Sequence, residues 1–264
     1  MLEIKNIYKT FNPGTINEKV DLNGLSLKLN EGDFVTVIGG NGAGKSTMLN
    51  AVAGVWPVDE GQIIIDGTDV TKLSEYKRAA YLGRVFQDPM TGTAATMGIE
   101  ENLALAKRRG KTRFLRSGIT KAEREEYKEL LKILNLGLED RLTSKVGLLS
   151  GGQRQALTLL MATLQKPKLL LLDEHTAALD PKTAAKVLDI TDRIVNRDHL
   201  TTLMITHNMK DAIAHGNRLI MMMNGKIILD IQGEEKKKLT VKQLLDKFEE
   251  ASGEEFSNDS AILG

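Results

Sequence analysis

A glycine-rich segment constrains the fold of this 264-residue chain more than any other feature. Residues 39–46 read GGNGAGKS, and Thr47 follows. The segment matches the pattern G-x-x-x-x-G-K-[ST], comes directly after the β-branched run FVTVI, and precedes a stretch that we expect to be helical through Ala53. Glycine allows backbone N–H groups to turn inward around phosphate oxygens, and a helix N-terminus adds positive potential. The segment therefore predicts a phosphate-binding loop between a buried strand and a helix.

The side chains of this loop predict a site for a nucleotide and Mg²⁺. Lys45 would place a positive charge on the β- and γ-phosphates, and the Ser46 hydroxyl would be a ligand of Mg²⁺, which prefers oxygen ligands and water. A glycine-rich turn with a chance lysine is the alternative, and the strand and helix on either side disfavour it. The predicted nucleotide-binding residues of the loop are Gly39, Gly40, Asn41, Gly42, Ala43, Gly44, Lys45, Ser46 and Thr47.

A run of leucines ends in two carboxylates. Leu169–Leu172 predicts a buried strand, and Asp173 and Glu174 follow it directly. Because ligands of α/β folds bind at the carboxyl ends of the strands, both carboxylates would lie beside the phosphate loop. Asp173 would reach the Mg²⁺ shell, and Glu174 would polarise a water that attacks a phosphate. Many strands end in Asp or Glu, so these two carboxylates indicate a catalytic site only in combination with the predicted phosphate-binding loop.

The segment LSGGQ, residues 149–153, predicts a second helix N-terminus that could bind an anion. Ser150 is expected to be the N-cap and Gln153 its capping-box partner. Gly151 and Gly152 would leave backbone N–H groups accessible. Because one nucleotide hardly needs two such sites from one subunit, we expect this segment to bind the nucleotide that another copy holds. The argument predicts a dimer with nucleotides in its interface.

With these three motifs in this order and spacing, the chain resembles the ATP-binding subunits of ABC transporters from about residue 2 to about residue 230. The resemblance implies an α/β fold: a P-loop NTPase core with a parallel sheet, an antiparallel β subdomain and a helical insertion at about residues 90–165. Residues 1–232 would form this domain, and residues 233–264 a polar C-terminal tail with one short helix, VKQLLDKFEE. The alternation of strands and helices along the chain independently favours a parallel-sheet core.

Turn and cap signals predict several element ends. The capping-box pattern at Thr120 begins an amphipathic helix that Gly137 can end. Asp180 followed by Pro181 predicts the start of another helix. Asn224–Gly225, between two apolar runs, predicts a tight hairpin turn.

The resemblance assigns roles to further positions. Phe11 matches the aromatic residue that stacks on adenine, with an ordinary strand aromatic as the alternative. Gln87 matches the glutamine that touches Mg²⁺ and the attacking water and senses the membrane partner. Asp180 ends the loop that communicates across the dimer, and His207 matches the histidine that contacts the γ-phosphate. The expected catalytic residues are thus Glu174, His207 and Gln87, and the expected Mg²⁺ ligands are Ser46, Gln87 and Asp173.

The chain departs from the family pattern at two positions after Glu174. His175 stands where the family commonly has Pro, and Ala177 stands where it commonly has Ser. Neither departure removes a catalytic group, so we expect a competent site, and two such sites in a homodimer. His175, His199 and His215 match no functional position and are expected to be structural.

Composition limits the partners. Lys and Arg number 36 against 35 Asp and Glu, a net charge of +1 that disfavours nucleic acid as a partner. The absence of Cys excludes disulfides and thiolate metal sites. No apolar run approaches the roughly 20 residues that a membrane-spanning helix needs. The basic stretch 107–116 is expected to be a solvated loop or a contact with anionic lipid or an acidic permease surface.

We therefore expect an ATPase that powers solute transport through separate integral-membrane permease subunits, with ATP and Mg²⁺ as cofactors. The resemblance implies a head-to-tail homodimer at the cytoplasmic face of the cell membrane. It favours uptake of an amino-acid-like solute, aromatic amino acids included, together with an extracytoplasmic solute-binding protein. Two alternatives stay open: an exporter or lipoprotein-release ATPase, and a non-transport ABC ATPase. The single cassette and the lack of a long heptad repeat disfavour ribosomal and DNA-repair types of the latter.

Overall fold

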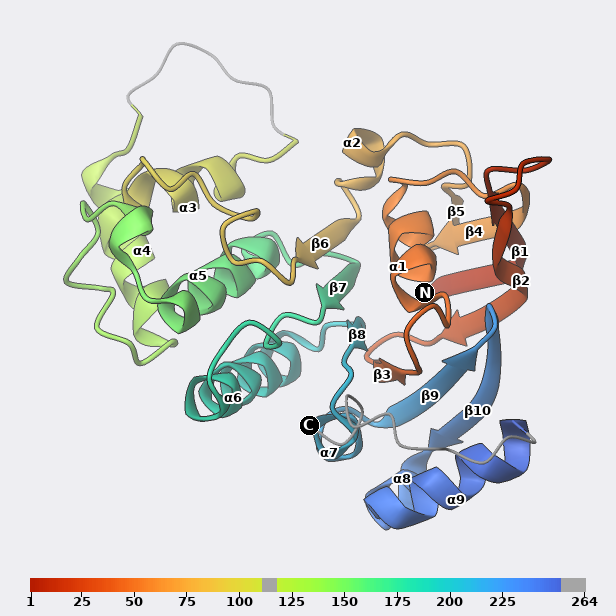
Figure 1. The fold of residues 1–264 in the computed structure, drawn as a ribbon. Helices are drawn as coiled ribbons and strands as arrows, with labels where there is room; N and C mark the ends of the chain where they lie inside the picture. Colours follow the sequence, from red (N-terminus) through yellow and green to blue (C-terminus); the bar gives the residue numbers. More distant parts are fainter. Residues whose placement is uncertain (111–117, 253–264) are drawn as a thin grey trace.

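The computed structural model describes residues 1–110 and 118–252, which form two sheets with helices packed around them (Figure 1). The larger sheet has the strand order β10-β9-β3-β8-β7-β6, and the smaller sheet has the order β2-β1-β4-β5. The larger sheet consists of β3 (Phe34–Ile38), β6 (Leu82–Val85), β7 (Leu169–Asp173), β8 (Thr202–Ile205), β9 (Arg218–Met223) and β10 (Lys226–Gln232). The smaller sheet consists of β1 (Leu2–Phe11), β2 (Lys19–Leu29), β4 (Glu60–Ile65) and β5 (Thr68–Asp69).

The larger sheet is parallel except at one edge. Strand β3 pairs in parallel with β8 and β9, and β7 pairs in parallel with β6 and β8. Strand β10 is antiparallel to β9, and Asn224 and Gly225 between them have φ values of 49° and 72°, which confirms the predicted hairpin turn. Together with the antiparallel smaller sheet and the helices, this arrangement confirms the predicted α/β fold class.

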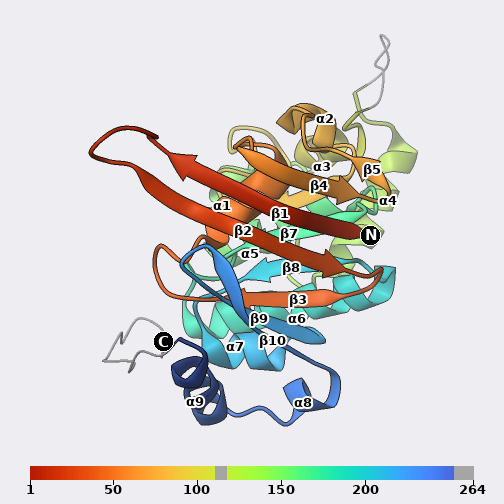
Figure 2. The same cartoon turned by 90° about the vertical axis from the view of Figure 1, so that its right-hand side faces the viewer.

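Helix α1 (Lys45–Ala53) lies between the two sheets, and the smaller sheet lies over it (Figure 2). One buried cluster joins Leu2 and Ile7 of the smaller sheet, Val37 of the larger sheet, and Met48 and Leu49 of α1. Each such fully buried aliphatic side chain contributes about 1.5–3 kcal/mol relative to an exposed one. The start of α1, which carries the phosphate loop, is therefore held from both sides.

The other end of α1 is held by a buried arginine. Arg78, at the end of the short helix α2 (Glu75–Arg78), is 2% exposed and donates hydrogen bonds to the carbonyls of Ala51 at 2.6 Å and Val52 at 3.0 Å. These carbonyls lie in the last turn of α1, where the helix carries partial negative charge. The guanidinium of Arg78, with its five N–H donors, satisfies these carbonyls, and its positive charge stabilises the negative end of the helix.

The helical insertion contains α3 (Ile99–Lys107), α4 (Lys121–Lys132), the short 3₁₀ helix Val146–Leu148 and α5 (Gly151–Thr163). The Thr120 hydroxyl accepts a hydrogen bond from the Glu123 N–H, which confirms the predicted cap of α4. The expectation that Gly137 ends this helix is wrong. Helix α4 ends at Lys132, because a turn follows in which Asn135 adopts a φ of 51°.

The C-terminal part of the chain contains α6 (Pro181–Asp198), α7 (Met209–Ala214), α8 (Gly233–Lys237) and α9 (Val241–Ser252). Leu244 and Phe248 of α9 share a buried cluster with Met209 of α7 and Ile231 of β10. The tail was expected to hold one short helix; within residues 233–252 it holds two, and one face of α9 is part of the core.

The surface features that bear on a membrane are few. Among the described helices, none combines the length and the apolar character needed to cross a bilayer. In the basic stretch 107–116, Lys107 forms an ion pair with Glu126, and Arg108 forms one with Glu123 at 2.9 Å. Residues 111–116 of that stretch lie outside the described residues.

Candidate nucleotide-binding and catalytic site

The phosphate loop connects β3 to α1, as its sequence predicts, and two of its glycines are required by close backbone contacts. Gly39 has a φ of 153°, and a Cβ there would lie 2.3 Å from the Met222 carbonyl oxygen. Gly44 has a φ of 95°, and a Cβ there would lie 2.5 Å from the Asp21 carbonyl oxygen. Glycine is therefore needed on both sides of the loop, which the smaller sheet and the β9–β10 hairpin enclose.

Lys45 begins α1 and turns its ammonium back toward the loop. Its Nζ donates to the Gly39 carbonyl at 2.7 Å and to the Gly40 carbonyl at 3.1 Å. Burial lowers the pKa of this lysine, whereas the nearby carboxylates of Glu174 and Asp173 act in the opposite direction. The partly desolvated ammonium is suited to bind a polyphosphate, because a charge-assisted hydrogen bond is stronger away from bulk water.

The two hydroxyls that follow Lys45 have different environments. Ser46 is exposed at the N-terminus of α1. Thr47 is buried, and its hydroxyl donates to Oδ2 of Asp21 at 2.6 Å. The Thr47 side chain therefore fixes α1 against β2, and the Ser46 hydroxyl is the one free to face a ligand.

Asp173 ends β7 and pairs with an arginine that carries no motif. Arg84 of β6 places its Nη2 3.3 Å from Oδ2 of Asp173 and donates to Oδ1 of Asn50 at 2.8 Å. Burial raises the pKa of Asp173, and the charge of Arg84 opposes that rise. Arg84 thus links β6, β7 and α1 at the edge of the site.

Glu174 follows β7 in a left-handed conformation, with a φ of 45°. Its N–H donates to the Ile205 carbonyl at 3.1 Å, and its carbonyl accepts from the Ala177 N–H at 2.9 Å. His207, two residues beyond β8, places Nδ1 3.6 Å from Oε2 of Glu174. The two predicted catalytic side chains are therefore brought together at the carboxyl ends of neighbouring parallel strands.

A cavity of about 310 Å³ lies beside this pair and is lined by Glu174, His207 and Asp211 among other residues. Burial raises the pKa of Asp211, and the charges of His215 and His207 oppose that rise. Asp211 was not predicted, because a single acid in the first turn of a helix is ordinarily read as a dipole partner. Within the described residues, no group of three or more His, Asp or Glu side chains is arranged to hold a metal ion.

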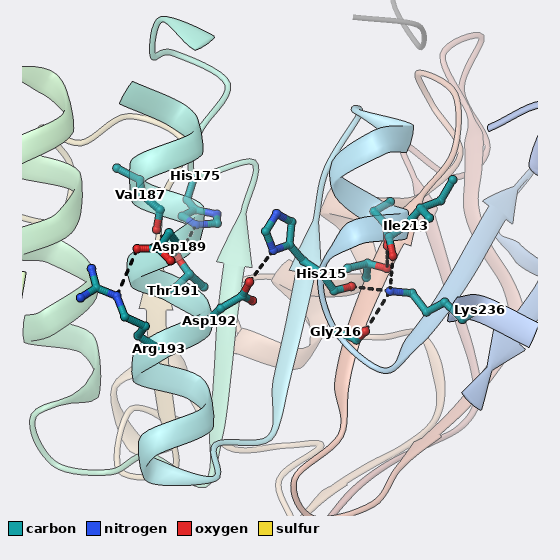
Figure 3. Close-up of polar contacts among 12 residues, drawn as sticks. His175, Val187, Asp189, Thr191, Asp192, Arg193, Ile213, His215, Gly216 and Lys236 are labelled. Carbon is teal, nitrogen blue, oxygen red and sulfur yellow. Dashed lines mark hydrogen bonds and ion pairs between the residues drawn. The ribbon is translucent and has the colours of Figure 1, made fainter. Parts of the chain in front are cut away.

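The three remaining histidines have structural surroundings. His175 is 2% exposed, its Nε2 lies 3.1 Å from Oγ1 of Thr191, and burial lowers its pKa to about 4 (Figure 3). His199 follows the last residue of α6 in a left-handed conformation, with a φ of 50°. His215 follows α7 and places Nδ1 2.7 Å from Oδ2 of Asp192 on α6.

Phe11 lies at the end of β1, and Gln87 lies in the loop after β6. The Phe11 ring, at the end of β1, meets the Trp56 ring edge to face with centroids 5.0 Å apart, and the Lys9 ammonium lies 5.6 Å from the Phe11 centroid. Gln87 is exposed in the loop after β6. Next to it, the Phe86 carbonyl accepts a hydrogen bond from the Gln155 side chain of α5 at 2.9 Å. The loop that contains Gln87 is thus hydrogen-bonded directly to α5, the helix that begins within the LSGGQ segment.

The LSGGQ segment forms the capping box that its sequence predicts. The Gln153 N–H donates to Oγ of Ser150 at 3.3 Å, and the Ser150 N–H donates to Oε1 of Gln153 at 3.2 Å. Gly152 faces α6, where a Cβ would lie 2.1 Å from Cγ2 of Thr183. Asp180, the N-cap of α6, accepts from the Thr183 N–H at 3.1 Å. The LSGGQ segment and the loop AALD, residues 177–180, therefore approach each other at one end of α5 and α6.

The structure does not join this segment to the phosphate loop. Across residues 1–110 and 118–252, no hydrogen bond or ion pair connects Ser150–Gln153 with residues 39–47. The predicted site residues thus form two groups. One surrounds Lys45, Asp173, Glu174 and His207, and the other is the start of α5.

Comparisons with known proteins add three findings. A family model described as ABC transporter matches residues 22–177. The chain is 47% identical over 256 residues to the tyrosine transport ATP-binding protein of Clostridioides difficile. This similarity covers 95% of this chain and 100% of that protein. It is 36% identical over 211 residues to the methionine import ATP-binding protein MetN of Rhizobium etli. This similarity covers 78% of this chain and 55% of that protein.

Solved structures show the same fold. The chain resembles the dimeric structure of a post-hydrolysis state of the ATP-binding cassette MJ0796 bound to ADP and Pi. The TM-score is 0.74 at 30% identity, and the similarity covers 88% of this chain and 98% of that one.

Proposed function

The chain belongs to the ABC transporter family, and from this premise we propose how its ATPase site works and which transport system it serves. It is an ATP-binding subunit that hydrolyses ATP. The family match over residues 22–177 includes the phosphate loop, the LSGGQ segment and the two carboxylates after β7. The roles of the individual residues are our proposal.

In this proposal Glu174 is the general base and His207 its partner on the γ-phosphate side. The observation that carries it is the 3.6 Å approach of His207 Nδ1 to Glu174 Oε2 at the ends of β7 and β8. Lys45 binds the β- and γ-phosphates and stabilises the charge that develops during phosphoryl transfer. The exposed Gln87 orients water from the loop after β6. Phe11 supplies the surface for adenine.

Mg²⁺ is the metal that fits the donors at this edge. Ser46 offers an exposed hydroxyl at the start of α1, Asp173 offers a carboxylate, and Gln87 offers an amide oxygen. All three are oxygen ligands, which Mg²⁺ prefers, and the remaining ligands of such an ion come from phosphate and water. Bound Mg²⁺ would neutralise charge on the β- and γ-phosphates.

We further propose that two copies of the chain associate head to tail, so that Ser150–Gln153 of one copy binds the ATP held by the other. The similar structure of MJ0796 is dimeric, which supports this arrangement. The separation of the two residue groups within one chain supports it as well, because the capped start of α5 presents N–H groups that the same chain's loop does not reach.

The transport system that we propose is an importer of an aromatic amino acid such as tyrosine. The support is the relative named for tyrosine transport, which this chain matches over the whole of that protein's length. The subunit would bind integral-membrane permeases at the cytoplasmic face of the membrane, and a solute-binding protein would deliver the solute from the other side. No residue of this chain needs to contact the solute.

Co-purification from detergent-solubilised membranes tests this proposal. A tagged copy of the chain should retain an integral-membrane permease and a solute-binding protein, identified by mass spectrometry. Cells that carry Lys45→Ala in place of the natural chain should lose uptake of labelled tyrosine. Retention of ribosomes or DNA without a permease would overturn the assignment to transport. Unchanged tyrosine uptake would overturn the assignment of tyrosine as the solute.

A further inference from the structure

Two adjacent residues of α6 hold the two loops that carry the proposed catalytic pair. Thr191 contacts His175, which directly follows Glu174, and Asp192 contacts His215, which directly follows α7 (Figure 3). Helix α7 begins two residues after His207. The residue after Glu174 and the residue after α7 are therefore both bonded to the middle of α6, whose first turn is capped by Asp180.

The hydrogen bonds of Thr191 determine which atom is the donor at His175. The Thr191 hydroxyl donates to the Val187 carbonyl at 2.9 Å, one turn earlier in α6. Its single hydrogen is therefore used, and its oxygen accepts from Nε2–H of His175 at 3.1 Å. The imidazole thus carries a proton on Nε2, and because burial lowers its pKa to about 4, the ring is neutral near pH 7. Both side chains are buried, with exposed fractions of 2% for His175 and 0% for Thr191.

The conformation of Glu174 makes such an anchor necessary. A φ of 45° is disfavoured for a residue with a long side chain, and it persists only where the surroundings impose it. On one side, the Glu174 N–H is held by the Ile205 carbonyl at 3.1 Å. On the other side, the next residue is His175, whose ring is fixed to α6. The backbone of Glu174 is thereby held between β8 and α6.

We propose that His175 is a positioning residue: its hydrogen bond to Thr191 holds Glu174 in the left-handed conformation that directs its carboxylate toward His207. The proposal rests on the proposed role of Glu174 as the general base. When the bond is removed, the buried N–H of His175 has no acceptor, and the ring leaves its place. Glu174 then relaxes toward common backbone conformations, and its carboxylate moves away from the attacking water.

Thr191→Val tests this directly, because valine keeps the shape of threonine and removes the acceptor. We expect kcat for ATP hydrolysis to fall about 10- to 100-fold, the effect of a misplacement near 1 Å, while KM for ATP changes by less than about twofold. Thr191→Ser keeps the hydroxyl and should restore kcat. His175→Leu removes the donor of the same hydrogen bond and should reproduce the loss of kcat. If only one of Thr191→Val and His175→Leu folds, that variant alone still tests the positioning role.

Thr163→Val on α5 is the matched control. Thr163 is also buried and also donates to a carbonyl one turn earlier, that of Leu159 at 2.9 Å. Its replacement removes the same kind of bond without a histidine partner, and kcat should stay near that of the natural protein. Equal losses in Thr191→Val and Thr163→Val would overturn the positioning role, as would an unchanged kcat in Thr191→Val.

The proposed function and this inference fail in different ways. If Glu174 is not the base, Glu174→Gln will hydrolyse ATP at the natural rate. If Glu174 is the base and His175 does not position it, Glu174→Gln will be inactive while Thr191→Val keeps the natural kcat.

Discussion

Lys45 and Gly39 are joined by a hydrogen bond from the lysine Nζ to the glycine carbonyl oxygen, 2.7 Å long, that closes the phosphate loop on itself. Gly39 directly follows β3 and lies against β9, where a Cβ would be 2.3 Å from the Met222 carbonyl oxygen. The ammonium that would meet the phosphates is thus oriented by the backbone of the loop it serves. Binding therefore depends on the charge of Lys45 and on its hold on the loop.

Lys45→Ala should weaken ATP binding. A hydrogen bond between an ammonium and a phosphate contributes about 1.5–3 kcal/mol, which corresponds to roughly a 10- to 100-fold increase in Kd. Fluorescent-nucleotide titration measures the change. Lys242→Ala, on an exposed position of α9, is the control and should bind ATP normally. Natural affinity in Lys45→Ala would reject the phosphate-loop assignment.

Ser150→Ala should impair ATP-dependent dimerisation more than it impairs ATP binding to the monomer. The substitution removes the cap of α5, which costs about 1 kcal/mol of stability, and also removes a hydroxyl proposed to face the partner's nucleotide. Thr120→Ala removes an equivalent capping box from α4 and should leave dimerisation intact. Light scattering with and without ATP separates the two variants, and equal behaviour would contradict the role in trans.

Lys236 should make stability rise with pH. The residue is 2% exposed, and its ammonium donates to the carbonyls of Ile213, His215 and Gly216 (Figure 3). Burial lowers its pKa from 10.5 to about 8. Between those values the unfolded chain binds more protons than the folded one, so this lysine's contribution to the free energy of unfolding increases with pH.

Urea unfolding of the natural protein and Lys236→Met at about pH 7 and about pH 10 measures this contribution. The difference in unfolding free energy, natural minus variant, should grow with pH. Lys237 is the control, because Glu234 raises its pKa above 10.5, so the folded and unfolded chains both keep its proton over most of this range and the difference for Lys237→Met should stay nearly flat. A difference for Lys236→Met that is flat across this range would show that the buried amine does not titrate there.

The places of the proposed phosphate-binding residues in the fold could be predicted from sequence, because the chemistry proposed for them requires fixed spacing. The loop at 39–47, the carboxylates after β7 and the capping box at Ser150 all lie on the predicted elements. The fold class followed from the alternation of strands and helices. These features depend on residues that are close together in the sequence, so they can be recognised from one sequence alone.

Features that depend on tertiary contacts could not be predicted. Arg84 is one arginine in a short strand, and only the pairing of β6 with β7 brings it to Asp173. Helix α9 looked polar because Lys and Glu surround Leu244 and Phe248, although these two residues are buried. The bond between His175 and Thr191 joins a loop to a helix and leaves no pattern in the sequence.

Glu174→Gln tests most directly whether Glu174 activates the attacking water. The variant keeps the size of the side chain and loses its charge, so ATP binding should stay near that of the natural protein. Turnover should fall at least about 100-fold, as expected for the loss of a general base, and an ATP-bound dimer should accumulate. Hydrolysis by Glu174→Gln at the natural rate would contradict the account.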